Sequence, residues 1–225
     1  MPNIRTLESL YEYIEKEYAW RIIELSNYRS FVLQAKEKNL DALLRGSVTL
    51  LYAHWEGFIK KCADYYYSYV INLNYPLSEL NNSFISIALR GEMESLTTSK
   101  KLKVHNDIIK VFYREKDKKP KFSSNSPIKT SNLNYGVFED VCILLGLSIY
   151  DFDERYKAKG FDRNLEKFID QTLVYKRNTI AHGNNLLITL TEFKELYDIV
   201  VNGLLYNFKE LIMDCAQSKK FLNNG

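Results

Sequence analysis

One ten-residue segment combines an arginine and a histidine at a spacing that suits phosphodiester chemistry. Residues 175–184 are YKRNTIAHGN, with Arg177, Asn178 and His182 on one predicted helix. An imidazole transfers protons near neutral pH, and a guanidinium offers phosphate a fixed positive charge. Asn178 and His182 share a helix face, whereas Arg177 lies about 140° around the helix from His182. Arg177 and His182 therefore converge only where the helix ends or distorts, as Gly183 suggests. From the residues alone, the alternative is an ordinary helix end whose histidine complements the helix dipole.

Motifs for metal, nucleotide or acyl chemistry are missing from the sequence. His54, His105 and His182 lie on separate predicted helices, and no HxH, HExxH or Cys/His cluster occurs, so we expect no metal site. There is no GxGxxG or GxxxxGK[ST] loop for phosphates and no GxSxG elbow for a hydrolase triad. We therefore expect neither a metal nor another cofactor.

Positive charge is concentrated in one stretch of the chain. Residues 110–129 hold seven Lys or Arg and two Asp or Glu, a net charge of +5, whereas the whole chain carries +3. Prolines, serines and an asparagine in the same stretch predict a loop over about 116–134. Its lysines are candidate contacts to an anionic substrate, namely Lys116, Lys118, Lys119 and Lys121. The alternative is a solvated basic loop.

The rest of the sequence predicts a helical bundle that positions these residues. Gly and Pro together make only 13 of 225 residues, which disfavours an all-β sandwich, and apolar residues recur at steps of three and four. We expect helices at 4–38, 40–73, 83–95, 98–115, 135–147, 162–182 and 191–217. The second is the most apolar and should be central, and Thr189 or Thr191 should cap the last. The prediction is one all-α domain over residues 1–225, a single bundle with a basic loop inserted.

Cysteine usage and hydropathy indicate where the protein works. Three cysteines lie far apart without a CxxC pair, which favours a reducing cytoplasm over a disulfide scaffold. The first residues contain no apolar signal region, and the longest nearly apolar run, 141–150, is far short of the ~20 residues that span a bilayer. We expect a soluble, cytoplasmic protein without membrane contact.

Two segments resemble a known family. RNTIAHG (177–183) resembles the Arg–Asn–xxx–His signature of the HEPN superfamily of helical ribonucleases. SVTLLYAHWEGFIKKCADYYYSYV (47–70) resembles the second helix of its RiboL-PSP-HEPN branch, and FEDVCILLGLS (138–148) and the helix over 191–220 extend the likeness along nearly the whole chain. The signature alone is short and degenerate, but its combination with the HWEGF helix in this order is fairly specific.

The resemblance implies an HEPN-like homodimer in which two motifs meet in a shared cleft. Such enzymes cut RNA without a metal and leave a 2′,3′-cyclic phosphate and a 5′-hydroxyl. By this resemblance His182 is the acid/base residue, Arg177 stabilises the phosphate and the transition state, and Asn178 orients or assists. The setting it implies is prokaryotic defence or toxin–antitoxin behaviour, with an antitoxin or a defence-system protein as a further partner. DNA lacks the 2′-OH nucleophile and should be inert.

Other interpretations stay open from the sequence. One is a non-catalytic HEPN module that binds RNA or a partner protein, and another is a helical interaction protein with a fortuitous motif. The loop lysines and Lys176 are the candidate RNA contacts. His54 and Glu56 are accessory candidates, and their alternatives are a satisfied helix histidine and an ordinary i,i+4 pair with Lys60. The tyrosines at 65–67 and 69 either stack on bases or belong to the core or dimer interface.

Overall fold

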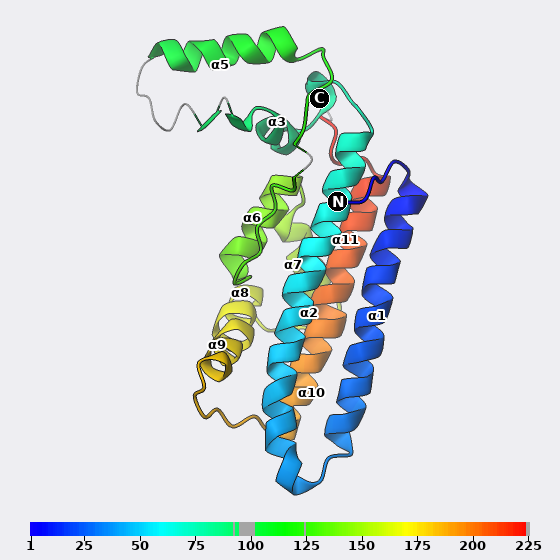
Figure 1. Cartoon of the computed structure of the whole chain (residues 1–225), viewed down its shortest axis with the longest axis vertical. Helices are drawn as coiled ribbons and strands as arrows, with labels where there is room; N and C mark the ends of the chain where they lie inside the picture. The colour runs from blue at the N-terminus through cyan, green and yellow to red at the C-terminus, as the bar shows by residue number, and fades with distance from the viewer. Residues whose placement is uncertain (92, 95–101, 124, 224–225) are drawn as a thin grey trace.

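Helices make up almost all regular structure in the described part of the chain (Figure 1). The computed structural model describes residues 1–91, 93–94, 102–123 and 125–223. Its elements are α1 (Leu7–Leu33), α2 (Glu37–Asn72), η1 (Leu77–Glu79), α3 (Asn82–Ala88), α5 (Leu102–Glu115), α6 (Tyr135–Leu145), α7 (Ile149–Ala158), α8 (Leu165–Lys167), η2 (Phe168–Val174), α9 (Tyr175–Ala181), α10 (Leu190–Asp198), η3 (Ile199–Leu205) and α11 (Tyr206–Gln217). Within these ranges the β-type pairing is a single bridge between Leu80 and Leu222. The predicted all-α bundle is confirmed.

Helix α2 is the longest element and lies in the middle of the bundle. It packs against α1, and α9, α10 and α11 also contact it (Figure 1). Trp55, Phe58, Tyr66 and Tyr67 are fully buried along it. Tyr69 is buried as well, so most of the tyrosine run belongs to the core rather than to an exposed base-stacking surface. No described helix has the length and apolar character needed to cross a membrane.

Two long helices each contain a π-helical segment that the sequence pattern did not indicate. α8, η2 and α9 form one continuous helix, and α10, η3 and α11 form another. The second begins at Thr189, whose side chain and that of Glu192 form a reciprocal capping box, which confirms one of the two predicted caps. π-helical turns are rare in proteins, but those that do occur are often found at functional sites. The π-helical segment η2 immediately precedes the segment that carries Arg177.

Helix α7 is absent from the predicted helices. The Ser148 side chain caps it by accepting a hydrogen bond from the Asp151 backbone N–H, and Phe152 and Tyr156 bury one side of it. The end of α6 at Gly146, with φ of 67°, agrees with the predicted end at 147, but the new helix that starts just after it at the Ser148 cap was not predicted. Of the two helices expected at 83–95 and 98–115, α3 and α5 are the described parts, and positions 92 and 95–101 lie outside the described residues.

Candidate active site

The arginine–histidine motif occupies the last turn of α9 and the residues that end it. Gly183, with φ of 79°, donates its backbone N–H to Ile180 O at 3.0 Å, and Asn184 donates to Thr179 O at 3.1 Å. This pair of bonds is a Schellman motif, in which a left-handed glycine ends the helix. The helix therefore ends where Gly183 suggested. His182 is the exposed cap residue, and its imidazole has no hydrogen-bond partner among the described residues.

Arg177 is held by two contacts, one with α2 and one with the segment before α6. Its guanidinium carbon lies 3.8 Å from the centre of the Tyr52 ring, and Nη2 donates to Asn132 Oδ1 at 2.9 Å. Asn132 has φ of 54°, in the left-handed region that asparagine tolerates better than most residues. Arg177 Nε is buried without a partner among the described residues. One face of the guanidinium is thus fixed by the Tyr52 ring, and its buried Nε donor is left without a partner.

A pocket of about 550 Å³ opens beside this guanidinium. Its lining comes from α2, from the segment before α6 and from α9, and consists of Thr49, Tyr52, Ala53, Glu56, Gly57, Lys60, Thr130, Ser131, Asn132 and Arg177. Asn178 and His182 are not among the residues that line it. Within one copy of the chain, Arg177 therefore faces α2, while His182 faces solvent at the helix end.

The electrostatics of the pocket depend on Tyr52 and Glu56. Burial raises the pKa of the Tyr52 phenol, the nearby Glu56 carboxylate raises it further, and the Arg177 cation opposes both effects. Tyr52 therefore stays neutral and offers its ring face to Arg177. Glu56, an accessory candidate from the sequence, lines this pocket together with Lys60 and forms no ion pair with it. Among the described residues, no group of three or more His, Cys, Asp or Glu is placed to hold a metal.

The chain after His182 is tied down at both ends. Arg45 of α2 donates from Nη1 to Asn185 Oδ1 at 2.9 Å and from Nη2 to Asn184 O at 3.0 Å. Lys176 Nζ lies 3.1 Å from Glu192 Oε1, at the start of α10. Lys176, a predicted RNA contact, is thus engaged within the protein, and its side chain is only 17% exposed. Arg45 was not singled out from the sequence because only the folded chain brings it to this loop.

Comparison with known proteins identifies the family of the chain. A family model described as HEPN_MAE_28990-like HEPN matches residues 10–221. The chain belongs to this HEPN family. The match does not confirm the RiboL-PSP-HEPN branch that the HWEGF helix resembles. No curated protein and no solved structure matches the chain. Membership of the HEPN superfamily indicates a nuclease or other RNA-related function.

His54 lies on the opposite side of α2 from the HEPN motif. Its Nδ1 is 3.1 Å from Arg21 Nη1, and its Nε2 is 2.8 Å from Glu24 Oε2. A guanidinium only donates, so Nδ1 accepts and the proton of the neutral ring is on Nε2, toward Glu24. Burial and the Arg21 charge lower the pKa of His54. His54 is therefore a buried histidine between α1 and α2, away from the Arg177 pocket. Its Nε2 is close to the Glu24 carboxylate but has no aligned hydrogen-bond partner among the described residues.

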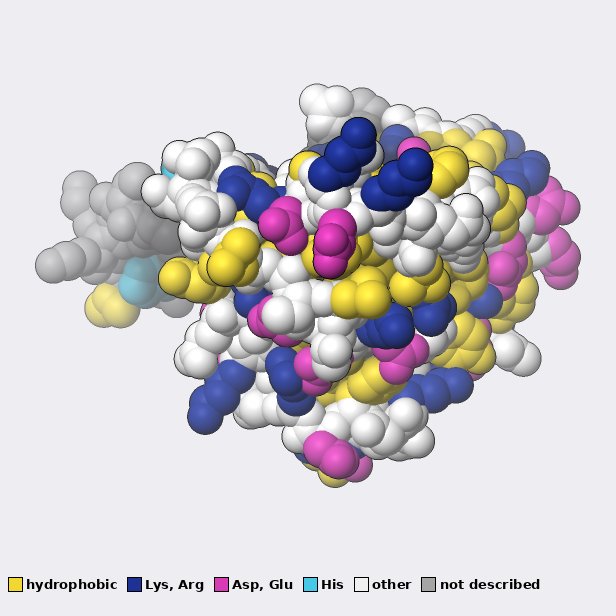
Figure 2. All heavy atoms as spheres, turned by 90° about the horizontal axis from the view of Figure 1, so that it is seen from below, with side chains coloured by type: hydrophobic (Ala, Val, Ile, Leu, Met, Phe, Trp, Pro, Cys, Tyr) yellow, Lys and Arg dark blue, Asp and Glu magenta, His cyan; other side chains and the backbone are white. Residues whose placement is uncertain are grey.

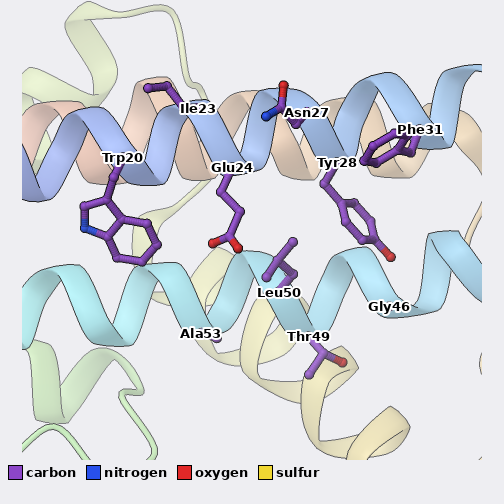
Figure 3. A pocket seen from close by; sticks show the side chains of 10 residues that line it. All are labelled: Trp20, Ile23, Glu24, Asn27, Tyr28, Phe31, Gly46, Thr49, Leu50 and Ala53. Carbon is purple, nitrogen blue, oxygen red and sulfur yellow. The ribbon is translucent and has the colours of Figure 1, made fainter.

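An apolar groove lies between α1 and α2 (Figure 3), and the ring centre of Trp20, one of its lining residues, is 5.3 Å from that of His54. Trp20, Ile23 and Phe31 of α1 form one wall, with Leu50 opposite on α2, and Glu24 extends between the two helices. Thr49 and Ala53 line both this groove and the Arg177 pocket.

The loop lysines lie far from the HEPN motif within one copy. Leu77 N–H donates to Lys118 O at 3.1 Å and Ser78 N–H to Lys116 O at 2.7 Å, which places this segment beyond the C-terminal end of α2. The Arg177 guanidinium lies over the Tyr52 ring. At 1.5 Å per residue, Tyr52 is roughly 30 Å from the C-terminal end of α2. The segment between them follows α2, with Tyr67 donating to Ser123 O at 3.3 Å.

The contacts that fix Arg177 had little signal in the sequence. Tyr52 lies four residues before Glu56, on the same face of the helical segment that contains HWEGF, but this spacing does not indicate that Arg177 contacts it. Asn132 had no such signal because its position depends on how the long segment before α6 returns along α2.

Proposed function

We propose that this chain is a metal-independent endoribonuclease that cuts RNA by attack of the 2′-OH. The 2′-oxygen bonds to phosphorus, the bond from phosphorus to the 5′-oxygen breaks, and the products carry a 2′,3′-cyclic phosphate and a 5′-hydroxyl. One proton leaves the 2′-OH and another reaches the 5′-oxygen, so the reaction needs a base and an acid. His182 carries protons, Arg177 stabilises the charge on the phosphate, and Asn178 orients the substrate. The observation that carries the proposal is the HEPN motif itself, with Arg177 fixed on α2 and an exposed, unpartnered His182 at the end of the same helix.

The proposed catalytic unit is a homodimer. Arg177 lines a pocket to which His182 does not contribute in one copy, and this supports a proposal in which one phosphate contacts both residues where two copies meet. A two-fold axis beside α9 supplies two histidines, one for each proton transfer, and two-fold dimers are the commonest oligomers. The proposal extends to residues 1–225 as one cytoplasmic domain that acts in prokaryotic defence or as a toxin, controlled by an antitoxin or another defence-system protein.

The separation of Arg177 from His182 within one copy also supports a second function. An arginine engaged by Tyr52 and Asn132, away from the histidine, is also compatible with a non-catalytic HEPN module that binds RNA or a protein. RNA cleavage separates the two proposals.

The decisive experiment compares His182→Ala, Arg177→Ala and Arg177→Lys with wild type in gel cleavage of RNA. General acid–base catalysis is worth about 10²–10⁴-fold, so His182→Ala should slow cleavage by at least about 100-fold. Arg177→Lys should recover part of the loss in Arg177→Ala because an ammonium cannot replace the planar fork. EDTA should not inhibit, and a 2′-deoxy substrate should stay intact.

The control is Lys16→Ala, which removes an exposed side chain on α1. At saturating RNA it should cleave as wild type does. Cleavage by His182→Ala at the wild-type rate would overturn the assignment of His182. A strict monomer by light scattering, with and without RNA, would overturn the composite site. RNA binding without cleavage by any variant would favour the non-catalytic module.

A further inference from the structure

We infer that α5 and residues 116–121 form a second RNA-binding surface, which we call the distal basic surface, and that the preferred substrate is an RNA strand long enough to reach from it to Arg177. This inference rests on the proposed ribonuclease function, because it names the substrate class of the same site.

The distal basic surface has a marked excess of positive charge. Residues 102–121 contain seven Lys or Arg and three Asp or Glu. Glu115 pairs with Arg114 at 2.7 Å and with Lys118 at 3.1 Å, and Lys110 lies 3.5 Å from Asp107. These pairs are exposed and therefore weak. Among the described residues, Lys119 and Lys121 are exposed and have no acidic partner. Such a surface attracts an anionic polymer.

The surface also has a defined shape. Backbone bonds from Leu77 and Ser78 fix the segment that carries Lys116 and Lys118 to the end of α2. A hollow of about 500 Å³ opens there, and Arg114, Lys118, Lys119 and Lys121 contribute to its lining.

An aromatic ring lies at the edge of this surface. Tyr113 is 64% exposed, and Lys116 Nζ lies 5.8 Å from the centre of its ring. Proteins that bind single-stranded nucleic acid combine exposed aromatic rings with basic side chains, because the bases stack on the rings and the phosphates pair with the cations. This favours RNA over other anionic partners.

The distance between the two sites sets a length for the RNA. α5 and α9 lie at opposite ends of α2 (Figure 1), and roughly 30 Å of helix separates Tyr52 from the C-terminal end of α2. At about 3.4 Å per nucleotide of one strand, this corresponds to about nine nucleotides. Lys60 lines the Arg177 pocket on the same helix and offers a cation between the two sites. Seen from the other end of the bundle, basic and acidic side chains are intermixed, without a patch of one sign (Figure 2).

The test measures binding rather than cleavage, in a His182→Ala background. Unstructured RNAs of about 5 and about 15 nucleotides are titrated across a salt series. Lys118→Ala, Lys119→Ala and Lys121→Ala are combined in one variant. Its matched control combines Lys16→Ala, Lys157→Ala and Lys159→Ala, which removes the same charge from exposed positions on α1 and at α7. Each triple variant contains one lysine that is ion-paired in the structure, Lys118 with Glu115 and Lys157 with Asp153.

The distal variant should bind the 15-nucleotide RNA at least 10-fold more weakly, and the slope of log Kd against log salt should fall by about two, at about 0.7 per lost phosphate contact. The control triple variant should leave both the affinity for the 15-nucleotide RNA and the salt slope unchanged. The 5-nucleotide RNA should bind the distal variant and the control variant with the same affinity. The inference would be overturned by an unchanged salt slope, by equal losses of affinity for the two RNAs, or by an equal loss of affinity in the control variant. So would binding to anionic lipid vesicles in place of RNA. Failure of wild type to cleave RNA would instead count against the proposed function, because this length dependence is read from binding alone.

Discussion

Gly57→Ala should destabilise the protein, although Gly→Ala within a helix normally stabilises it. Gly57 belongs to the HWEGF segment in the middle of α2. A Cβ built there lies 2.9 Å from Arg21 Nη2 and 3.2 Å from Nη1. The guanidinium is not free to retreat, because Nη2 donates to Glu17 Oε1 at 2.6 Å and Nη1 lies 3.1 Å from His54 Nδ1. Arg21 is only 6% exposed, so the methyl group would enter a packed, charged interior.

The magnitude follows from two opposing effects. Replacing glycine in a helix interior gains about 1 kcal/mol of helix propensity. Overpacking costs about 1–3 kcal/mol, and loss of one partner of a buried ion pair costs about 3–5 kcal/mol. A partial shift of Arg21 should therefore leave a net loss of about 1–2 kcal/mol. For a chain of this size, each kcal/mol lowers Tm by about 2–4 °C.

Denaturant and thermal unfolding provide the measurement, with Gly136→Ala as the matched control. A Cβ on Gly136 has Asn134 Oδ1 as its nearest neighbour, at an ordinary 3.7 Å, so that variant should be neutral or slightly stabilised. In a background with Glu17→Gln and Arg21→Met, Gly57→Ala should become stabilising, because the obstructing guanidinium is gone. A stabilised Gly57→Ala single variant would refute the argument that Arg21 needs this glycine.

Two further predictions concern buried and anchoring side chains. The pKa of His54 is lowered in the folded state, whereas in the unfolded chain it is about 6.5, so its contribution to stability is complete above that pH and is lost as the pH falls. Urea unfolding at pH 5.5 and 7.5 should show a larger loss for wild type than for His54→Gln, and equal losses would contradict this. Arg45→Ala should speed hydrogen exchange in residues 183–189, since it removes both bonds to Asn184 and Asn185, and Arg45→Lys should restore only part of the protection. Unchanged exchange would show that the loop does not depend on Arg45.

Local signals in the sequence were sufficient for most of the helices, with α7 and the π-helical segments as exceptions, and for the end of the motif. The apolar pattern of residues 40–73 identified α2 as central because a helix surrounded by others must be apolar around much of its circumference. Gly183 ended α9 and Thr189 began α10 because these caps depend on neighbouring backbone groups alone. Each of these features involves residues within a few positions of one another.

Features that depend on distant contacts were not accessible in this way. Arg177 contacts Tyr52 and Asn132, which lie far from it in the sequence and meet it only in the folded bundle. The basic loop was expected beside an anionic substrate, but its charge alone gave no position along α2. Backbone bonds to η1 determine that it lies at the far end from Arg177.

The spacing within the motif has a consequence for the proposed mechanism. Five residues in an ideal helix turn through about 140°, whereas four turn through only about 40°. Arg177 is therefore directed onto Tyr52 of α2, and Asn132 in the segment before α6 also holds its guanidinium. His182 extends from the helix end, free of hydrogen bonds to the described residues. A four-residue spacing would place both groups on one face, and a single copy would then present them together. With the spacing found here, the fixed cation and the free imidazole diverge within one copy, and the proposed ribonuclease brings them to one phosphate by pairing two copies.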